Sequence, residues 1–297
     1  MNILIPVDGT EHSLRAVQFL TARTDLLGDD PHITIFVAQM PMPQRVLAGS
    51  ATMAIEDFYK EEAETIFAAA RALLQGSGLD VDMRYSVGLP AEDIVAEADR
   101  IDADLIVMGI RGHGPVNGFL FGSVSNAVLA QTHRPVLMLR DKLPEGTQGL
   151  RVGLAVDGSD YSEHAVNYVL KHRSLFGQTP RFELVNAGLT THPIELSSMA
   201  SMLSSPHAAE DMVALRETYL KSVMTPLLPK FVAAGLDAHV VRLDGKPGEV
   251  IADYAETAPL DLLVMGSHGY GNLRSVLLGS TAMKIAAHSS VPLLIIR

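Results

Sequence analysis

The amino-acid sequence predicts an α/β protein built from two tandem domains, each a five-stranded parallel sheet with helices on both faces. Three observations lead to this class. Short apolar runs alternate with longer helical segments along the chain, as in a parallel sheet wound on both faces. The whole alternation occurs twice. The length of 297 residues is also sufficient for about two domains of ordinary size.

In the first copy, the apolar runs predict five buried strands: Ile3–Val7, Ile33–Ala38, Val81–Ser86, Leu105–Met108 and Val136–Leu139. Helical segments are expected at Glu11–Thr24, Ala51–Gln75, Ala91–Arg100 and Gly122–Thr132. Thr10 suits the cap of the first helix, Gly76 follows the second, and Pro90 suits the first turn of the third.

The second copy repeats these elements, with strands expected at Arg151–Val156, Phe182–Asn186, Ala238–Leu243, Leu262–Met265 and Leu293–Ile296. The offset between the copies grows from 149 residues at Asp8 and Asp157 to 157 at Gly109 and Gly266. About eight extra residues are therefore expected between the second and third strands, most naturally in Leu189–Pro206. The predicted domains are 1–141 and 151–297, joined by a linker at 142–150.

Composition narrows the class of function. The formal net charge of −11 argues against general binding to nucleic acid or to anionic membranes. The absence of cysteine excludes disulfides, thiolate catalysis and cysteine-bound zinc. The N-terminal residues lack the basic and apolar parts of a signal peptide, and no apolar stretch approaches the ~20 residues of a membrane span. These features predict a cytoplasmic protein.

A glycine pattern that occurs twice is the main functional signal. Gly109, Gly112, Gly122 and Ser123 read G-x2-G-x9-G-S, and Gly266, Gly269, Gly279 and Ser280 repeat that spacing. Glycines between a strand and a helix let backbone N–H groups approach an anion. The serines then begin helices whose first free N–H groups, including those of Val124 and Thr281, face the same place. The pattern predicts a phosphorylated ligand.

Ligands of such sheets bind beyond the carboxyl ends of the strands. Asp8 and Asp157 end the first strands, so each should share a crevice with the glycine loop that follows the fourth strand. Other phosphate motifs are absent: the chain has no G-x4-G-K-[ST] loop and no G-x-G-x-x-G loop.

With these motifs, both copies strongly resemble the universal stress protein family in its tandem form. The resemblance rests on V-D-G-[TS], G-x-P, V-M-G and the glycine loop, over about 1–140 and 151–297. It implies the adenine nucleotide alpha hydrolase-like fold with strand order 3-2-1-4-5, and binding of adenine nucleotide, above all ATP, with Mg²⁺ able to accompany it. It further implies fifth strands, Pro135–Arg140 and Pro292–Arg297, that pair within the chain as an intramolecular pseudo-dimer, and it leaves a further homodimer open.

The resemblance also implies residue roles. Asp8 and Asp157 would lie near the ribose or adenine, and Ala38 and Asn186 would flank the base. The phosphates would be held in the first copy by Gly109, Gly112, Gly122, Ser123 and Val124, and in the second by Gly266, Gly269, Gly279, Ser280 and Thr281. Because Asn186 is polar where Ala38 is small, the two base pockets are expected to differ. The longer Leu189–Pro206 segment could cover the second site.

Simpler roles stay open for these residues. The glycines could serve only to pack a helix against a strand, and the aspartates and serines could serve only to cap helices. Arg111 and Arg274 could add positive charge beside the phosphates, or they could simply be solvated. The 11 histidines lack a metal-binding spacing, so the sequence predicts no metal site built by the protein alone.

The leading interpretation is a nucleotide-binding regulatory or stress-protective protein with no catalytic residues. Whether it is an enzyme stays open, with weak ATP hydrolysis as the most that the sequence indicates, because no phosphate-loop lysine is present. The alternatives are a slow ATPase or adenylyl-transfer enzyme and an interaction scaffold that does not depend on nucleotide.

Overall fold

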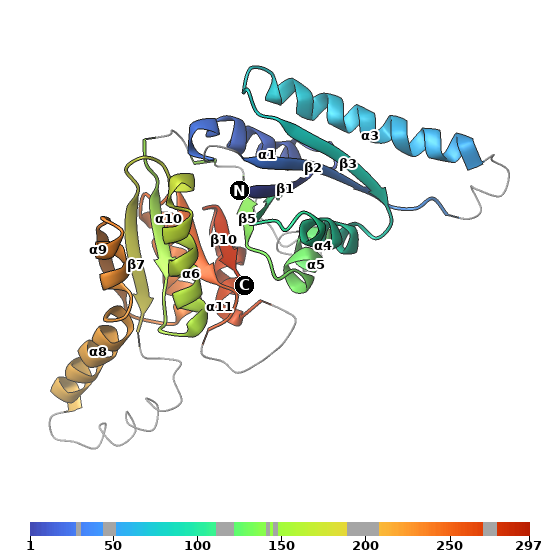
Figure 1. Ribbon diagram of the computed structural model, residues 1–297. Coiled ribbons are helices and arrows are strands. Elements are labelled where there is room, and N and C mark those ends of the chain that lie inside the picture. The colour runs from blue at the N-terminus through green and yellow to red at the C-terminus, as the bar shows by residue number, and fades with distance from the viewer. Residues whose placement is uncertain are drawn as a thin grey trace. The chain divides into compact units, whose positions relative to one another are not determined.

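A computed structural model describes residues 1–27, 31–43, 52–110, 122–140, 143–144, 148–188, 208–269 and 278–297. The chain forms two compact units, Met1–Thr147 and Gln148–Arg297 (Figure 1). The predicted domain and linker boundaries stay a prediction.

The first unit contains one parallel sheet in the order β3-β2-β1-β4-β5. Its strands are β1 (Asn2–Pro6), β2 (His32–Gln39), β3 (Val81–Val87), β4 (Leu105–Gly109) and β5 (Val136–Leu139). Its helices are α1 (Glu11–Thr21), the 3-10 turn η1 (Thr24–Leu26), α3 (Thr52–Leu74), α4 (Pro90–Arg100) and α5 (Ser123–Gln131). Helices α1 and α3 cover one face and α4 and α5 the other (Figure 1).

The second unit repeats this arrangement, with the order β8-β7-β6-β9-β10. Its strands are β6 (Arg151–Ala155), β7 (Arg181–Ala187), β8 (Ala238–Leu243), β9 (Leu262–Gly266) and β10 (Leu293–Ile296). Its helices are α6 (Asp160–Lys171), the 3-10 turn η2 (Arg173–Phe176), α8 (Ala208–Met224), α9 (Leu228–Ala233), α10 (Pro247–Thr257) and α11 (Ser280–His288). Both units therefore confirm the predicted fold and the strand order 3-2-1-4-5.

The starts of the helices follow from local chemistry. The Thr10 side chain accepts a hydrogen bond from the Ser13 N–H at 3.3 Å, and Ser159 accepts one from Ser162 at 3.3 Å. These N-caps satisfy backbone donors that have no partner within the helix. Helices α4 and α10 each have proline in the first turn, where its missing N–H costs no helical bond. Strong caps thus fix where the helix after the first strand begins in each unit.

The registers correct one predicted equivalence. Val7 donates to the carbonyl of Phe36, and Val156 donates to that of Val185, so the first two strands of both copies keep an offset of 149. Ala38 therefore corresponds to Ala187, and the equivalence of Ala38 with Asn186 is wrong. The prediction went wrong because it matched the residues by their places near the strand ends, β2 ending at Gln39 and β7 at Ala187, whereas the pairing with the first strand sets the correspondence.

The third strands of the two copies are offset by 157 residues, because Ile33 pairs with Val81 whereas Phe182 pairs with Ala238. The second copy therefore has eight more residues between its second and third strands, as predicted. The whole of Leu189–Pro206, their expected place, lies outside the described residues.

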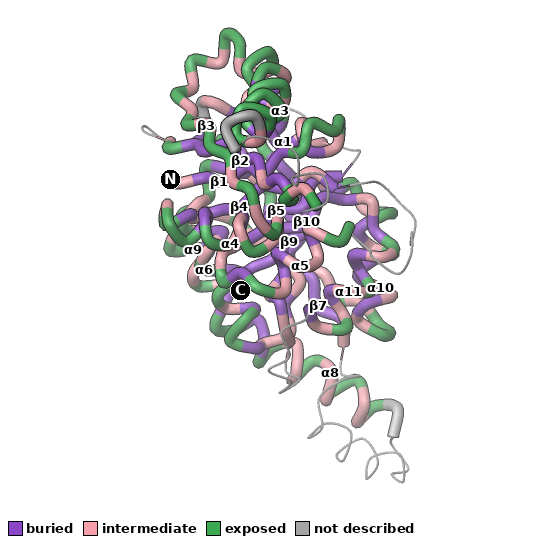
Figure 2. The backbone as a smooth tube through the Cα atoms, turned by 90° about the vertical axis from the view of Figure 1, so that its right-hand side faces the viewer, coloured by how far each residue is buried: buried purple, intermediate pink, exposed green. Residues whose placement is uncertain are grey.

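Burial differs between central and outer strands (Figure 2). Ile3, Leu4 and Ile5 of β1 are at most 1% exposed. In β3, by contrast, every residue is intermediate or exposed, so the prediction that Val81–Ser86 is a buried strand is wrong. The strand is present, but it lies at the end of the first unit's strand order and pairs with β2, and its sequence alternates apolar with polar residues. Within the described residues, no helix is long and apolar enough to cross a membrane.

Candidate nucleotide site

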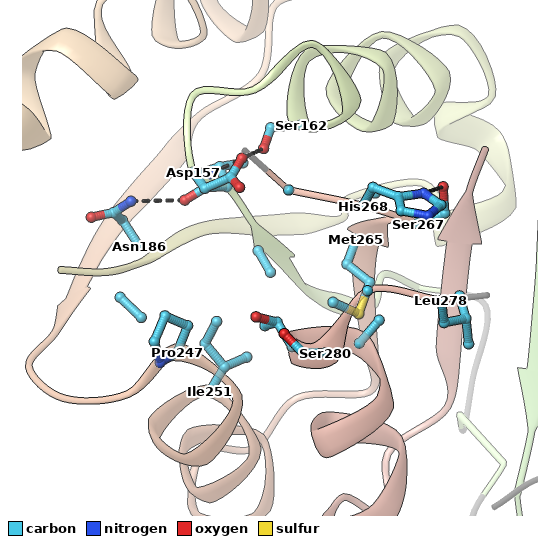
Figure 3. Close-up of a pocket in the computed structure, with 18 of the residues that line it drawn as sticks. Asp157, Ser162, Asn186, Pro247, Ile251, Met265, Ser267, His268, Leu278 and Ser280 are labelled. Carbon is cyan, nitrogen blue, oxygen red and sulfur yellow. Dashed lines mark hydrogen bonds between the residues drawn. The ribbon is translucent and has the colours of Figure 1, made fainter. Parts of the chain in front are cut away.

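A cavity of about 350 Å³ lies in the second unit, at the carboxyl ends of β6, β7 and β9 (Figure 3). Its walls include all the residues predicted for the second site: Asp157, Asn186, Gly266, Gly269, Gly279, Ser280 and Thr281. Residues from distant parts of the chain thus meet in one cavity at the edge where ligands of parallel sheets bind.

The Asp157 carboxylate forms one polar wall of the cavity. Its Oδ1 accepts from the Ser159 N–H at 3.0 Å, from the Ser159 hydroxyl at 2.6 Å and from the Ser162 hydroxyl at 2.6 Å. A Cβ atom added to Gly269 would lie 2.5 Å from Asp157 Oδ2. One oxygen is therefore committed to the turn, while the other faces the backbone of the glycine loop.

Asn186 lies beside this carboxylate on β7 (Figure 3). Its side chain is 2% exposed, and its Nδ2 donates to the Val156 carbonyl at 2.8 Å. A buried amide needs such a partner. The hydrogen bond joins β7 to the end of β6 and fixes the position of Asn186 in the cavity wall.

The opposite polar wall is the first turn of α11. The Met283 N–H donates to the Gly279 carbonyl at 2.9 Å. By helix geometry, the N–H groups of Ser280, Thr281 and Ala282 precede the intrahelical bonds and carry the positive end of the helix dipole. All three residues line the cavity. Gly279 also donates to the Ser267 carbonyl at 2.9 Å, so the two ends of the glycine loop are tied together.

Two of the pattern glycines also have a packing role. A Cβ atom on Gly109 would lie 1.6 Å from the His12 carbonyl oxygen, and one on Gly266 would lie 2.7 Å from Tyr161 Cβ. Both distances are far inside van der Waals contact. The helix after the first strand therefore approaches the end of the fourth strand closely only because that position has no side chain.

Comparison with known proteins identifies the family. The universal stress protein family model matches residues 1–140 and again residues 150–297. The chain belongs to the universal stress protein family. It has the tandem form, with two such domains in one chain.

Some relatives match the whole chain, and others match about half of it. Universal stress protein Slr1230 of Synechocystis is 24% identical over 317 aligned residues, covering 100% of this chain and 99% of the relative. A universal stress protein of Thermus aquaticus is 34% identical over 139 residues, covering 46% of this chain and 97% of the relative. The crystal structure of a universal stress protein from Archaeoglobus fulgidus matches with a TM-score of 0.72 at 20% identity, covering 100% of this chain and 98% of that one; this likeness shows the fold.

The first copy of this universal stress protein has the same turn after its first strand. Asp8 Oδ1 accepts from the Thr10 N–H at 3.0 Å and from the Thr10 hydroxyl at 2.6 Å. Partial burial of Asp8 acts to raise its pKa. Hydrogen bonds from Thr10 and Ser13 together outweigh this effect, so the pKa lies below the ordinary value of 3.8. The carboxylate is therefore held in its ionised form by the turn.

The other first-copy residues lie at the expected ends of elements. Ala38 is next to last in β2, and Gly109 ends β4. Gly122 is the N-cap of α5 with φ of 96°, and Ser123 and Val124 begin that helix. Gly112 lies outside the described residues, as do Arg111 and Arg274. Among the described residues, no group of three or more His, Asp or Glu side chains could hold a metal ion.

Several cavity residues were not predicted from the sequence. Tyr219 comes from α8, and its hydroxyl donates to the Asp157 carbonyl at 3.2 Å. Pro247 and Ile251 come from α10, and His268, whose Nδ1 lies 3.0 Å from the Ser267 hydroxyl, follows β9. The G-x-P step and the residue after V-M-G-S were signals for Pro247 and His268. No pattern marked Tyr219, because α8 follows the segment in which the two copies differ in length.

Proposed function

We propose that this universal stress protein binds an adenine nucleotide, with ATP as the leading candidate. The nucleotide would bind in the cavity of the second unit and at the matching position of the first unit. We further propose that binding serves a regulatory or stress-protective role and not rapid catalysis. One observation carries the proposal: the predicted second-copy residues, drawn from both polar walls and from the glycine loop, line a single cavity.

The chemistry of the walls suits the parts of a nucleotide. The Asp157 carboxylate is an acceptor for hydroxyl groups such as those of a ribose. Across the cavity, the N-terminus of α11 offers N–H donors and a positive dipole end to phosphate. Pro247, Ile251 and Met265 supply apolar surface for a base (Figure 3). The volume of about 350 Å³ lies within the usual range for small-molecule sites.

The same walls argue against efficient phosphoryl transfer. The ionisable side chains among the described residues lining the cavity are Asp157, Tyr219 and His268, with no lysine or arginine. Fast transfer needs positive charge on the phosphates and a placed base, and Oδ1 of Asp157 is already held by two hydroxyl groups. Mg²⁺ would be held by the phosphates and water.

Calorimetry on nucleotide-stripped protein tests the proposal, with ATP, ADP, AMP and cyclic AMP as titrants, each with and without Mg²⁺. We expect ATP to bind with micromolar affinity. Gly269→Ala should weaken binding at least about tenfold. The new Cβ would lie only 2.5 Å from Asp157 Oδ2, so the carboxylate would have to move out of its place in the cavity wall. Val232→Ala in α9, at an exposed side chain that does not line the cavity, is the control and should leave binding unchanged. No binding by the wild-type protein at millimolar nucleotide would overturn the proposal.

The pairing of the fifth strands remains a proposal about the assembly of the two domains. Strands β5 (VLML) and β10 (LLII) are apolar, and each is the last strand of its own unit. Such edges favour association with another strand. We propose that they pair within one chain; a crystal structure with the two strands far apart would contradict this.

A further inference from the structure

The outer edge of β3 is the starting point for an inference that does not depend on nucleotide binding. Strand β3 pairs with β2 over seven positions, from Val81 to Val87. Among the described residues of the first unit, no strand pairs with its other edge. A free edge presents unpaired N–H and C=O groups, which make it a template for another strand.

Exposed apolar residues occur near the carboxyl end of β3. The large apolar side chains that are exposed among the described residues of the first unit are Met40, Phe58, Tyr85, Val87 and Leu89, each at least 40% exposed. Gln39, which precedes Met40, links the residues next to the others. Its carbonyl accepts from the Gly88 N–H at 2.9 Å, and its side-chain amide donates to the Tyr59 carbonyl at 3.0 Å. They therefore form one patch around the end of β3. An exposed cluster of this kind is typical of an interaction surface.

The sequence of β3 is complementary to itself in the antiparallel direction. If Met83 faces its own copy across a twofold axis, Asp82 lies directly opposite Arg84 of the second strand, and Arg84 opposite Asp82. Val81 then lies opposite Tyr85. Opposite charges and pairs of an aromatic with a β-branched residue are favourable cross-strand neighbours. Within the unit, the Arg84 guanidinium lies 4.0 Å from the Asp82 carboxylate and 3.8 Å from that of Glu97 in α4. The Asp82 and Arg84 side chains are 73% and 48% exposed, so both can still reach a partner strand.

The matching edge of the second unit lacks this complementarity. With the offset of 157, Asp82 and Arg84 correspond to His239 and Val241 of β8. An antiparallel pair centred on Val240 would place a histidine opposite a valine on each side. No residue from 238 to 243 is among the large apolar side chains that are exposed. The feature is therefore specific to β3.

We propose that two copies of this chain associate through β3, in an antiparallel pair centred on Met83 with twofold symmetry. We assign the partner as a second copy of the chain because Asp82 and Arg84 of one β3 strand can pair with Arg84 and Asp82 of another. The apolar patches would flank the paired strands and be covered in the dimer. The interface involves neither cavity residues nor the fifth strands. A test of this interface is therefore independent of the proposals on nucleotide binding and on pairing of the fifth strands.

A cysteine at the centre of the strand gives a direct test. The chain contains no cysteine, so Met83→Cys would carry a single thiol. Directly opposite residues in an antiparallel pair have Cβ atoms about 4.5–5.5 Å apart, near enough for a disulfide after a small adjustment. We expect mild oxidation of the full-length variant to give a covalent dimer. Val240→Cys, at the equivalent position of β8, should stay mainly monomeric under the same conditions; equal cross-linking of both variants would overturn the proposal.

A charge exchange tests the register by sedimentation. Asp82→Arg or Arg84→Asp alone places like charges opposite each other twice in the dimer, and each should weaken association at least about tenfold. The double variant, Asp82→Arg with Arg84→Asp, restores both pairs in reverse and should recover most of the affinity. Circular dichroism checks that each variant folds. A monomeric wild-type protein at high micromolar concentration, or a double variant no better than the single ones, would overturn the proposal.

Discussion

Asp8 and Asp157 occupy equivalent turns, and each accepts hydrogen bonds through Oδ1 from the residue two positions later. Their surroundings differ. Asp8 is more exposed than Asp157, which lies beside Tyr219. Tyr219 lines the same cavity as Asp157 and donates to its backbone carbonyl. The turn that begins the first helix is therefore the same in both copies. In the second copy, α8 adds Tyr219 beside the aspartate and so helps to enclose the site.

The largest difference that we expect between the copies concerns stability. In Gly109→Ala, the added Cβ would lie 1.6 Å from the His12 carbonyl oxygen, so α1 and β4 must separate. We expect the free energy of unfolding of the first unit to fall by about 3 kcal/mol. Gly266→Ala should cost less, about 1–2 kcal/mol, because its nearest atom is Tyr161 Cβ at 2.7 Å. Urea unfolding followed by hydrogen exchange measures both; equal losses would show that the packing at the two junctions is the same.

The second expected difference concerns binding. In Asp157→Asn, the turn keeps an acceptor, but an amide replaces the carboxylate that faces the cavity. We expect nucleotide affinity at the second site to fall about tenfold, which corresponds to about 1.4 kcal/mol. Asp8→Asn should leave that site unchanged. Titration of both variants with ATP separates the two sites, and an equal loss of affinity at the second site in both variants would contradict the assignment of the cavity.

Much of this comparison could be predicted from the sequence. Apolar runs located the strands, and Thr10 located the start of α1, because both depend on local patterns. Burial of β3 and the equivalence of Ala38 with Asn186 were wrong, because sheet position and register depend on neighbouring strands. Tyr219 was missed for a related reason: its place above Asp157 depends on how α8 packs, which no local pattern encodes.

A smaller effect is expected from Tyr219→Phe. The substitution keeps the ring but removes the hydroxyl that donates to the Asp157 carbonyl at 3.2 Å. A single neutral hydrogen bond contributes about 0.5–1.5 kcal/mol, so nucleotide affinity should fall two- to tenfold while the fold stays intact. Calorimetry measures the loss. If affinity does not change, the hydroxyl has no part in shaping the site.

The smallest effect is expected for Asp8 and concerns pH. Its pKa is lowered in the folded chain, so ionised Asp8 stabilises the fold. That contribution is fully present above the ordinary value of 3.8 and is lost as the pH falls through the lowered pKa. Asp8→Asn should therefore be slightly less stable than the wild-type protein at neutral pH, and the difference should vanish in strong acid. A difference that grows on acidification would show that the turn does not favour the charged form.

The hydrogen bonds to Asp157 Oδ1 have a consequence for the thermodynamics of ligand capture. Ser159 and Ser162 hold the carboxylate in one rotamer before any ligand arrives, so the entropy of ordering that side chain is lost during folding and not during association. Because the same oxygen anchors the first turn of α6, occupancy of the cavity and fraying of that turn are coupled, and a bound molecule would slow amide exchange at the start of α6.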